Sequence, residues 1–205
     1  MLTTKDLILR DITEADLARH LHWETVEAEW QLWDGPWEYE GLSDEERLTE
    51  AHAYVDKLRA RMERLRTLPP DAPRTTFHIA RKDAPDCAIG WMNSYCIDEN
   101  FSYTDGGGCI AIGIDIPEPA ARGKGYGTQA LGAFVAYLLA VGAETVYTQT
   151  WSGNARMIHL AQKLGFEECC RKPGLRRVRG QSYDGLTFRL NVKKFHKMWE
   201  MVSKA

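Results

Sequence analysis

A glycine-rich turn at residues 122–128 is the part of the sequence whose residue types and spacing indicate chemistry most clearly. It reads Arg-Gly-Lys-Gly-Tyr-Gly-Thr, follows the apolar run 112–116 and opens a predicted helix. Glycines at alternate positions let the backbone approach a ligand closely and orient several N–H groups the same way. The helix N-terminus favours an anion, and Arg122 and Lys124 add positive charge. We therefore predict a pyrophosphate-binding site here.

Hydrophobic periodicity predicts the elements that must position this turn. Apolar runs predict strands at residues 7–9, 76–80, 87–95, 109–116, 145–151, 166–170 and 186–192. Helical spacing predicts helices from Thr13 through Leu21, from Ser43 through Leu65, over residues 128–139 and over residues 154–164. Turns are predicted at 83–86 and 105–108. The chain shows no repeat and no long linker, so we expect one α+β domain over residues 1–205.

The glycine spacing excludes two other phosphate-binding motifs. The sequence has no Walker A run, in which Gly-Lys is followed by Ser or Thr. The dinucleotide fingerprint Gly-x-Gly-x-x-Gly fails because the third glycine here comes only two residues after the second. The pattern that fits is (Gln/Arg)-x-x-Gly-x-(Gly/Ala), with Arg122, Gly125 and Gly127. It resembles the acetyl-coenzyme A site of the GNAT N-acetyltransferase superfamily.

A second motif strengthens this resemblance. Residues 154–166 are similar to the family's helix that begins with Asn and ends in Lys-Leu-Gly-Phe, one strand after the first motif. The opening Leu-Ile-Leu-Arg with its Thr-x-x-Asp helix start, and the closing Leu-Arg-Arg…Asp-Gly…Phe-Arg-Leu, resemble the RimJ/RimL-like branch. The resemblance implies a GNAT-type fold, with a central mixed, mostly antiparallel, twisted sheet flanked by helices. It also implies transfer of an acetyl group from acetyl-coenzyme A to an amine, which would be a protein or peptide N-terminus or a small amine.

The same resemblance implies which residues hold acetyl-coenzyme A. The turn would hold the pyrophosphate, the central strand would offer backbone groups to the pantetheine arm, and Asn154 would bind the cofactor arm. The cofactor-binding residues implied are Ile114, Asp115, Ile116, Arg122, Gly123, Lys124, Gly125, Tyr126, Gly127, Thr128 and Asn154.

The proton-transfer residues of the family are not matched. Where many relatives have a Glu in the central strand, and a Tyr and a Ser in the second motif, this chain has Ala111, Ala161 and Met157. Three alternatives follow: another residue substitutes, solvent carries the protons, or the protein is a non-catalytic acyl-coenzyme A-binding or regulatory domain. The candidate catalytic substitutes are Asp115, Ser152, His159 and Glu29.

Two of these candidates have a simpler interpretation. His159 lies about 140° around the helix from Asn154, which is typical of a surface or partly buried histidine. Asp115 sits in an otherwise apolar strand, and it could only mark where that strand emerges beside the cofactor.

Residues 24–50 combine many acidic residues with several tryptophans, and Arg47 is the only basic residue among them. Carboxylates beside aromatic faces attract a cationic amine through ion pairing and cation–π contact. We hypothesise that Trp30, Trp33 and Asp34 help to line an amine pocket. The alternative is a solvated acidic face with tryptophans in the core.

Composition and charge exclude several other classes. The chain has 26 Lys and Arg against 29 Asp and Glu, a net charge of -3, so a nucleic-acid partner is not expected. The basic stretch 171–180 reads as a solvated hairpin, although it could also meet an acidic partner or the adenosine 3′-phosphate. The five cysteines have neither CxxC nor Cys/His metal spacing, so we expect reduced thiols and no metal. With no secretory signal and no membrane-spanning run, we expect a cytoplasmic monomer or homodimer.

Overall fold

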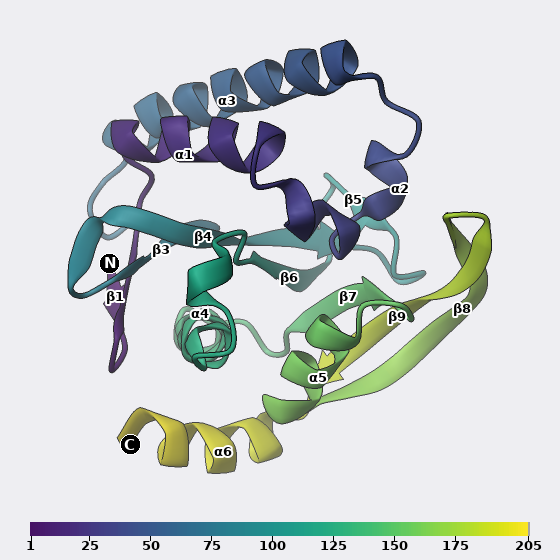
Figure 1. The fold of residues 1–205 in the computed structure, drawn as a ribbon. Helices are drawn as coiled ribbons and strands as arrows, with labels where there is room; N and C mark the ends of the chain where they lie inside the picture. Colours follow the sequence, from purple (N-terminus) through teal and green to yellow (C-terminus); the bar gives the residue numbers. More distant parts are fainter. Residues whose placement is uncertain (205) are drawn as a thin grey trace.

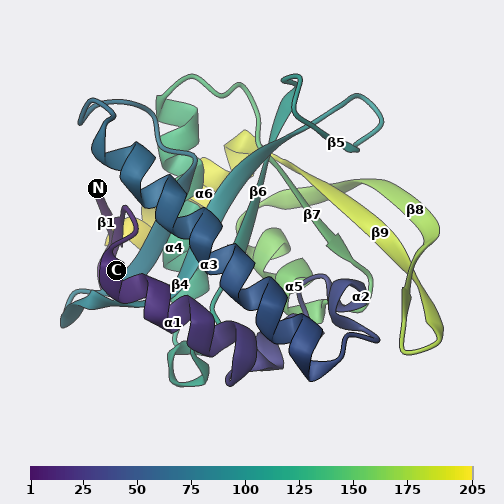
Figure 2. The same cartoon turned by 90° about the horizontal axis from the view of Figure 1, so that it is seen from above.

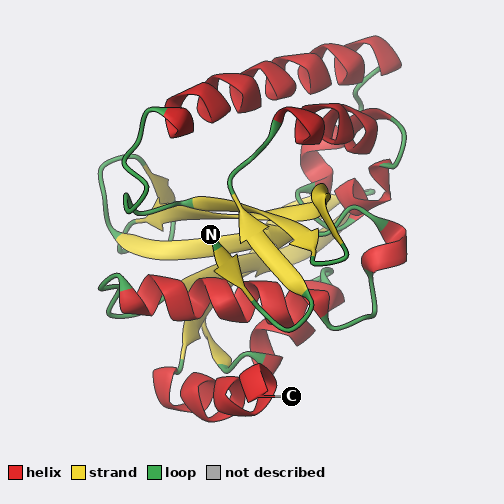
Figure 3. Cartoon of the chain, turned by 90° about the vertical axis from the view of Figure 1, so that its left-hand side faces the viewer, coloured by secondary structure: helices red, strands yellow, loops and turns green. Residues whose placement is uncertain are grey.

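In the computed structural model, which describes residues 1–204, nine strands form one sheet between two layers of helices (Figure 1, Figure 3). The strands are β1 (Leu2–Thr3), β2 (Leu7–Arg10), β3 (Thr76–Arg81), β4 (Ala84–Ile97), β5 (Tyr103–Thr104), β6 (Cys109–Asp115), β7 (Tyr147–Trp151), β8 (Phe166–Val178) and β9 (Gln181–Leu190). The helices are α1 (Glu14–Thr25), α2 (Pro36–Tyr39), α3 (Asp44–Arg66), α4 (Tyr126–Ala140), α5 (Ala155–Lys163) and α6 (Val192–Lys204), with 3₁₀ turns η1 (Ala28–Leu32) and η2 (Pro119–Ala121).

The sheet order is β1-β2-β3-β4-β6-β7-β9-β8, with β5 paired to β4. The described pairs are antiparallel except β6 with β7, which is parallel. Helices α1 and α3 lie side by side across one face (Figure 2), and α4, α5 and α6 cover the other (Figure 1). The predicted mixed, mostly antiparallel sheet flanked by helices is therefore confirmed.

Side-chain caps fix the starts of the helices on the first face. The Asp16 carboxylate accepts the Thr13 backbone N–H at 2.8 Å at the start of α1. At the start of α3, the Ser43 hydroxyl accepts the Glu46 N–H at 3.2 Å, and the Glu46 carboxylate accepts the Ser43 N–H at 2.8 Å. Such reciprocal caps satisfy donors that the first helical turn leaves free, which is why the sequence predicted both starts well.

Three sequence predictions need correction. The turn expected at 83–86 is shorter, because β4 begins at Ala84. The strand expected to end at 170 continues to Val178 and forms a long hairpin with β9. The last strand spans Gln181–Leu190 rather than 186–192. It begins earlier because it pairs with the long β8, and it ends earlier because the Asn191 carboxamide oxygen accepts the Lys194 N–H at 3.1 Å and starts α6. The elements that were not predicted are β1, β5, η1, α2, η2 and α6.

The largest hydrophobic cluster lies between the sheet and α4. Its fully buried members include Phe77, Ile112, Leu131, Phe134 and Phe188. No helix of the described chain is both long and apolar enough to cross a membrane.

A buried histidine pair connects α1 to the sheet on the other face. The Nε2 atoms of His20 and His78 lie 2.8 Å apart, and both side chains are almost completely inaccessible to water. Burial lowers the pKa of His20 to about 3 and that of His78 to about 4. The nearby Asp16 carboxylate opposes these shifts without cancelling them. Both imidazoles are therefore neutral in the folded protein near neutral pH.

We expect this pair to make stability fall as the solution is acidified. Below pH 6.5 the unfolded chain binds protons on both imidazoles, whereas the folded chain does not until about pH 4. Between pH 7 and pH 5, the wild type should lose on the order of 2 kcal/mol of unfolding free energy relative to His78→Gln. Urea unfolding at the two pH values measures this difference, since the remaining groups titrate in both proteins. An equal loss in both proteins would contradict a buried neutral imidazole at position 78.

Candidate functional site

The strands β6 and β7 separate in the middle of the sheet, and a cavity opens between them. Their pairing consists of Ala111 with Tyr147 and Ile112 with Thr148, and it stops there. Beyond Ile112, the β7-facing backbone groups of β6 have no ladder partner, so they are available to a ligand. A first cavity of about 520 Å³ extends from this gap to the start of α4 and to α5.

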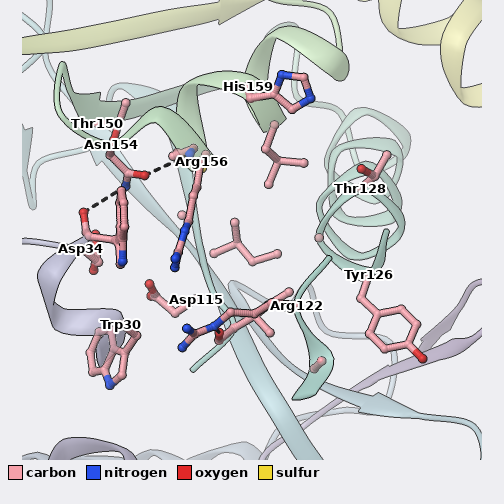
Figure 4. A pocket seen from close by; sticks show the side chains of 18 of the residues that line it. Trp30, Asp34, Asp115, Arg122, Tyr126, Thr128, Thr150, Asn154, Arg156 and His159 are labelled. Atoms are coloured by element: carbon pink, nitrogen blue, oxygen red, sulfur yellow. Dashed lines mark hydrogen bonds between the residues drawn. The ribbon is translucent and has the colours of Figure 1, made fainter. Parts of the chain in front are cut away.

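The first cavity contains most of the predicted cofactor-binding residues. Residues Ile114, Asp115, Ile116, Arg122, Gly123, Gly125, Tyr126, Gly127, Thr128 and Asn154 line it. Lys124, the remaining predicted residue, is exposed and does not line this cavity. Residues that the prediction missed are also in the wall, among them Arg156, Gln149 and Thr150. The structure thus brings the two sequence motifs to one site (Figure 4).

The glycine-rich turn forms a concave row of backbone donors at the start of α4. Gly123 and Gly125 have φ values of 72° and 79°, which residues with a side chain rarely adopt. Gly125 is the N-cap residue of α4. The N–H groups of Tyr126, Gly127 and Thr128 come before that of Gln129, which donates to the Gly125 carbonyl and is the first N–H bonded within the helix. The turn therefore presents unpaired N–H groups and a helix dipole toward the cavity, as an anion site requires.

The Arg122 side chain lines the first cavity, but its donors are bonded to backbone carbonyls after β6 and to Glu29. Its Nε donates to the Ile116 carbonyl at 3.0 Å, and its other donors reach the Pro117 carbonyl and the Glu29 carboxylate. Glu29 also accepts from Arg156 at 3.2 Å and from the Trp33 indole at 2.7 Å. Burial favours the protonated carboxyl, but the hydrogen bonds from Trp33 and Arg122 outweigh it and lower the pKa of Glu29. Glu29 is therefore an ionised partner of two arginines.

Asn154 holds the segment 28–34 against α5. Its Oδ1 accepts the Met157 N–H at 3.0 Å, which caps α5, and its Nδ2 donates to the Trp33 carbonyl at 2.9 Å. The Trp151 indole donates to the same carbonyl at 2.7 Å. The Arg156 guanidinium lies 4.0 Å from the centre of the Trp33 ring. The predicted contact of Asn154 with the cofactor arm stays a prediction.

A second cavity of about 540 Å³ meets the first cavity at a shared wall. Trp30, Asp34 and Asp115 line both cavities. Figure 4 shows these three side chains in the wall of the first cavity. The remaining walls come mostly from α1, the segment 31–42, α3 and β4. Gly90 on β4 lies so close to the Asp115 carbonyl that a Cβ atom there would overlap the oxygen, so glycine permits this approach.

The carboxyl groups at and beside this shared wall have raised pKa values. Enclosure by protein raises the pKa of Asp115 well above its ordinary value, and the neighbouring charges of Asp34 and Glu24 raise it further. Desolvation by the surrounding protein groups likewise raises the pKa of Asp34 to about 6 and that of Glu24 to about 7. Carboxyl groups poised near neutral pH can exchange protons with a reacting group.

The other catalytic candidates lie apart from the shared wall. The Ser152 hydroxyl accepts the Asp184 N–H at 3.0 Å on the turn after β7, and Ser152 lines neither cavity. His159 lies at the rim of the first cavity, on the α5 side and away from Asp115 (Figure 4). Their catalytic roles stay predictions, as does that of Asp115, which is the candidate at the wall that both cavities share.

The tryptophans of residues 23–37 divide between core and cavity. Trp23 is fully buried, and its carbonyl accepts the Trp30 indole N–H at 2.9 Å. Trp30 lines both cavities, Trp33 lines the first, and the Trp37 ring lies 4.1 Å from the Arg176 guanidinium of the β8–β9 hairpin. The basic hairpin is thus partly engaged by the acidic segment.

Comparison with known proteins decides the family. The sequence model of the family described as "Acetyltransferase (GNAT) domain" matches residues 6–167, which include both motifs and the cavities between them. The chain belongs to the GNAT acetyltransferase family. Acetyl-coenzyme A is the co-substrate of this GNAT acetyltransferase, and the first cavity fits it through the unpaired donors of the turn at 123–128 and the free backbone edge of β6.

Solved structures share the fold of this GNAT chain at low sequence identity. An acetyltransferase (GNAT family) from Bacillus anthracis is 12% identical, with a TM-score of 0.65 over 92% of this chain and 96% of the other. Spermidine N-acetyltransferase from Vibrio cholerae, in complex with coenzyme A and spermine, is 16% identical, with a TM-score of 0.63 over 93% and 98%. The ribosomal L7/L12 α-N-protein acetyltransferase RimL, with coenzyme A, is 16% identical, with a TM-score of 0.62 over 92% and 95%. The sequence matches none of the curated proteins with which it was compared.

Proposed function

We propose that this GNAT protein is an N-acetyltransferase of the RimJ/RimL-like branch that acts on a primary amine. The observation that carries the proposal is the junction of the two cavities at the end of β6. The first cavity has the glycine-rich turn at 123–128, which suits an anion, and the second has the carboxylates that a cationic amine requires. An amine at the junction would lie between the glycine-rich turn and Asp115.

We assign four tasks to the residues of this chain. The turn at 123–128 binds the pyrophosphate, and the free backbone edge of residues 113–115 orients the pantetheine arm and the thioester oxygen. Asp34 and Asp115 bind the ammonium group of the acceptor, and Asp115 accepts the proton that the ammonium must lose before its nitrogen can attack. Acetyl-coenzyme A supplies the activated acetyl group.

The names of two structural neighbours support an amine acceptor without choosing among amines. One is named for spermidine and the other for the N-terminus of a ribosomal protein. Both a small polyamine and a protein N-terminus therefore belong in the acceptor panel.

A thiol-release assay tests this proposed function. With acetyl-coenzyme A and a panel of alkyl amines, polyamines and peptides, we expect release of coenzyme A that depends on the acceptor, with the acetylated amine detected by mass spectrometry. The substitutions Ala111, Ala161 and Met157 at the family's usual proton-transfer positions suggest a second candidate, a non-catalytic acyl-coenzyme A-binding domain. Tight coenzyme A binding without acceptor-dependent release across the panel would favour that second candidate.

A further inference from the structure

The second cavity has more acidic groups than the binding of one ammonium requires. Asp34 and Asp115 stand at the wall shared with the first cavity, whereas Glu24, Glu38 and Glu50 line the second cavity alone. These carboxylates therefore continue from the junction into the second cavity. A substrate whose reacting nitrogen lies at the junction would extend past Glu24, Glu38 and Glu50.

The basic groups of this cavity do not neutralise that set. The cavity is also lined by Arg47 and Lys57. The Arg47 guanidinium is held by the Tyr39 carbonyl at 2.6 Å and the Gln31 side-chain oxygen at 3.3 Å. Both basic residues lie on α3, whereas the shared wall is acidic. The cavity thus remains negative overall, most strongly at the wall it shares with the first cavity.

The carboxylates at the junction lack counter-charges from the protein. Among residues 1–204, Asp34 and Asp115 make no side-chain hydrogen bond and no ion pair, although both line the two cavities. Asp115 is half-buried, whereas Asp34 keeps much of its surface exposed. Glu24 accepts a hydrogen bond from the neutral Gln31 amide at 3.0 Å. A half-buried carboxylate without a partner is costly, so a cationic ligand would offset that cost at Asp115 and add an ion pair at Asp34.

Aromatic side chains complete the walls between these charges. Trp30, Tyr39, Tyr54 and Trp91 line the second cavity, and the rings of Trp30 and Trp91 lie edge to face with centres 5.3 Å apart. Such walls accept methylene groups through apolar contact and ammonium groups through cation–π contact. Carboxylates and aromatic walls in one cavity suit a chain of methylenes with a charge at each end.

We propose that the second cavity binds a linear aliphatic diamine or polyamine lengthwise, with the reacting nitrogen at Asp34 and Asp115 and the next cationic centre at Glu24, Glu38 and Glu50. This inference rests on the proposed function, since it names the acceptor of the same site. A peptide N-terminus carries one ammonium followed by neutral amides, so it would leave the three outer carboxylates without a counter-charge.

Asp115, the acceptor nitrogen and the coenzyme A sulfur account for every proton in the acetyl transfer. The acceptor ammonium gives one proton to Asp115, and its nitrogen forms the C–N bond to the acetyl carbonyl carbon while the C–S bond breaks. The nitrogen then loses a second proton, and the departing sulfur takes up one. The products are the acetamide, coenzyme A as its thiol and one proton, which Asp115 returns to solvent.

A matched set of acceptors tests the inference. We expect kcat/KM for butane-1,4-diamine or spermidine to exceed that for butylamine at least tenfold at low salt. The variants Glu24→Gln and Glu50→Gln should each reduce this preference at least threefold by lowering turnover of the diamine more than that of butylamine. Glu45→Gln is the control, because Glu45 lies on the same helix as Glu50 but lines neither cavity. It should leave the preference unchanged.

Calorimetry gives a readout that needs no turnover. Because desolvation raises the pKa of Glu24 and Asp34 toward neutrality, binding of spermidine at pH 7 should release protons. The observed heat should then depend on the ionisation enthalpy of the buffer. This dependence should weaken in Glu24→Gln.

The outcomes separate the inference from the proposed function. Equal kcat/KM for butylamine and the diamine, or a peptide acceptor preferred over both, would overturn the diamine assignment and leave the N-acetyltransferase intact. Absence of turnover for every acceptor would instead count against the proposed function. In that case spermidine binding with proton release would still support the inference, and its absence would overturn it.

Discussion

Replacing Asp115 by asparagine should lower kcat for acetyl transfer about 10²- to 10⁴-fold, the range expected for removal of a general base. Asp115 lies at the wall that the two cavities share, and among the described residues no hydrogen bond or ion pair occupies its carboxylate. Asparagine has nearly the same shape but cannot accept the ammonium proton. The dissociation constant of coenzyme A should stay within about twofold, since the N–H groups of the turn at 123–128 are unchanged.

The pH profile distinguishes a proton acceptor from a residue that only shapes the wall. In the wild type, the rate should rise with pH as the carboxyl set of Asp115, Asp34 and Glu24 ionises, with an apparent pKa that belongs to the set. Asp115→Asn should remove or displace this rise. Asp34→Asn, which removes a neighbouring charge, should retain a larger share of the activity. A kcat within threefold of wild type for Asp115→Asn would contradict the assignment.

Stability should change in the opposite direction to activity. The folded-state pKa of Asp115 is raised, so the folded protein favours the protonated carboxyl and loses stability as the pH rises from the ordinary value of 3.8 through the raised one. At pH 8, Asp115→Asn removes this penalty and should unfold at a higher temperature than the wild type. A less active but more stable variant is typical of a residue retained for function.

Local patterns explain what the sequence predicted well. The two capping boxes, the glycine-rich turn and the start of α5 at Asn154 are each set by residues within four positions of one another. The departures at Ala111 and Ala161 are also consistent with the structure, since both side chains are fully buried. The starts of α4 and β6 were therefore placed within two residues of the observed positions.

The remaining features depend on contacts between distant segments. The second cavity joins α1, α3 and β4, and the pairing of Glu29 with Arg122 and Arg156 spans about half of the chain. Sequence spacing carries no signal for such contacts, so Glu29 appeared as a candidate base rather than as an arginine partner. Arg156 was missed although it lies within the second motif, because the family pattern gave it no role. The start of α6 was missed although Asn191 offered an N-cap.

Replacing Arg122 by methionine should raise the dissociation constant of coenzyme A about 10- to 100-fold, as expected for a charge-assisted contact of about 1.5–3 kcal/mol. Methionine keeps the volume of the stem but removes the donors to the Ile116 and Pro117 carbonyls and the positive charge beside the turn. It also removes one of the two arginines that pair with Glu29. The negative charge of Glu29 would then be less neutralised and would repel an anion bound at the turn.

A double-mutant cycle with Glu29→Gln identifies how Arg122 acts. Glutamine retains an acceptor for the Trp33 indole but has no charge, so Glu29→Gln alone should tighten coenzyme A binding, and it should reduce the effect of Arg122→Met to about fivefold. Lys124→Met is the matched control, because Lys124 belongs to the same turn but does not line the cavity, and its effect should stay within about threefold. Isothermal titration with coenzyme A at two salt concentrations measures the four proteins of the cycle and the Lys124→Met control. If Glu29→Gln weakened binding, Glu29 would be holding Arg122 in place for the pyrophosphate rather than competing with it.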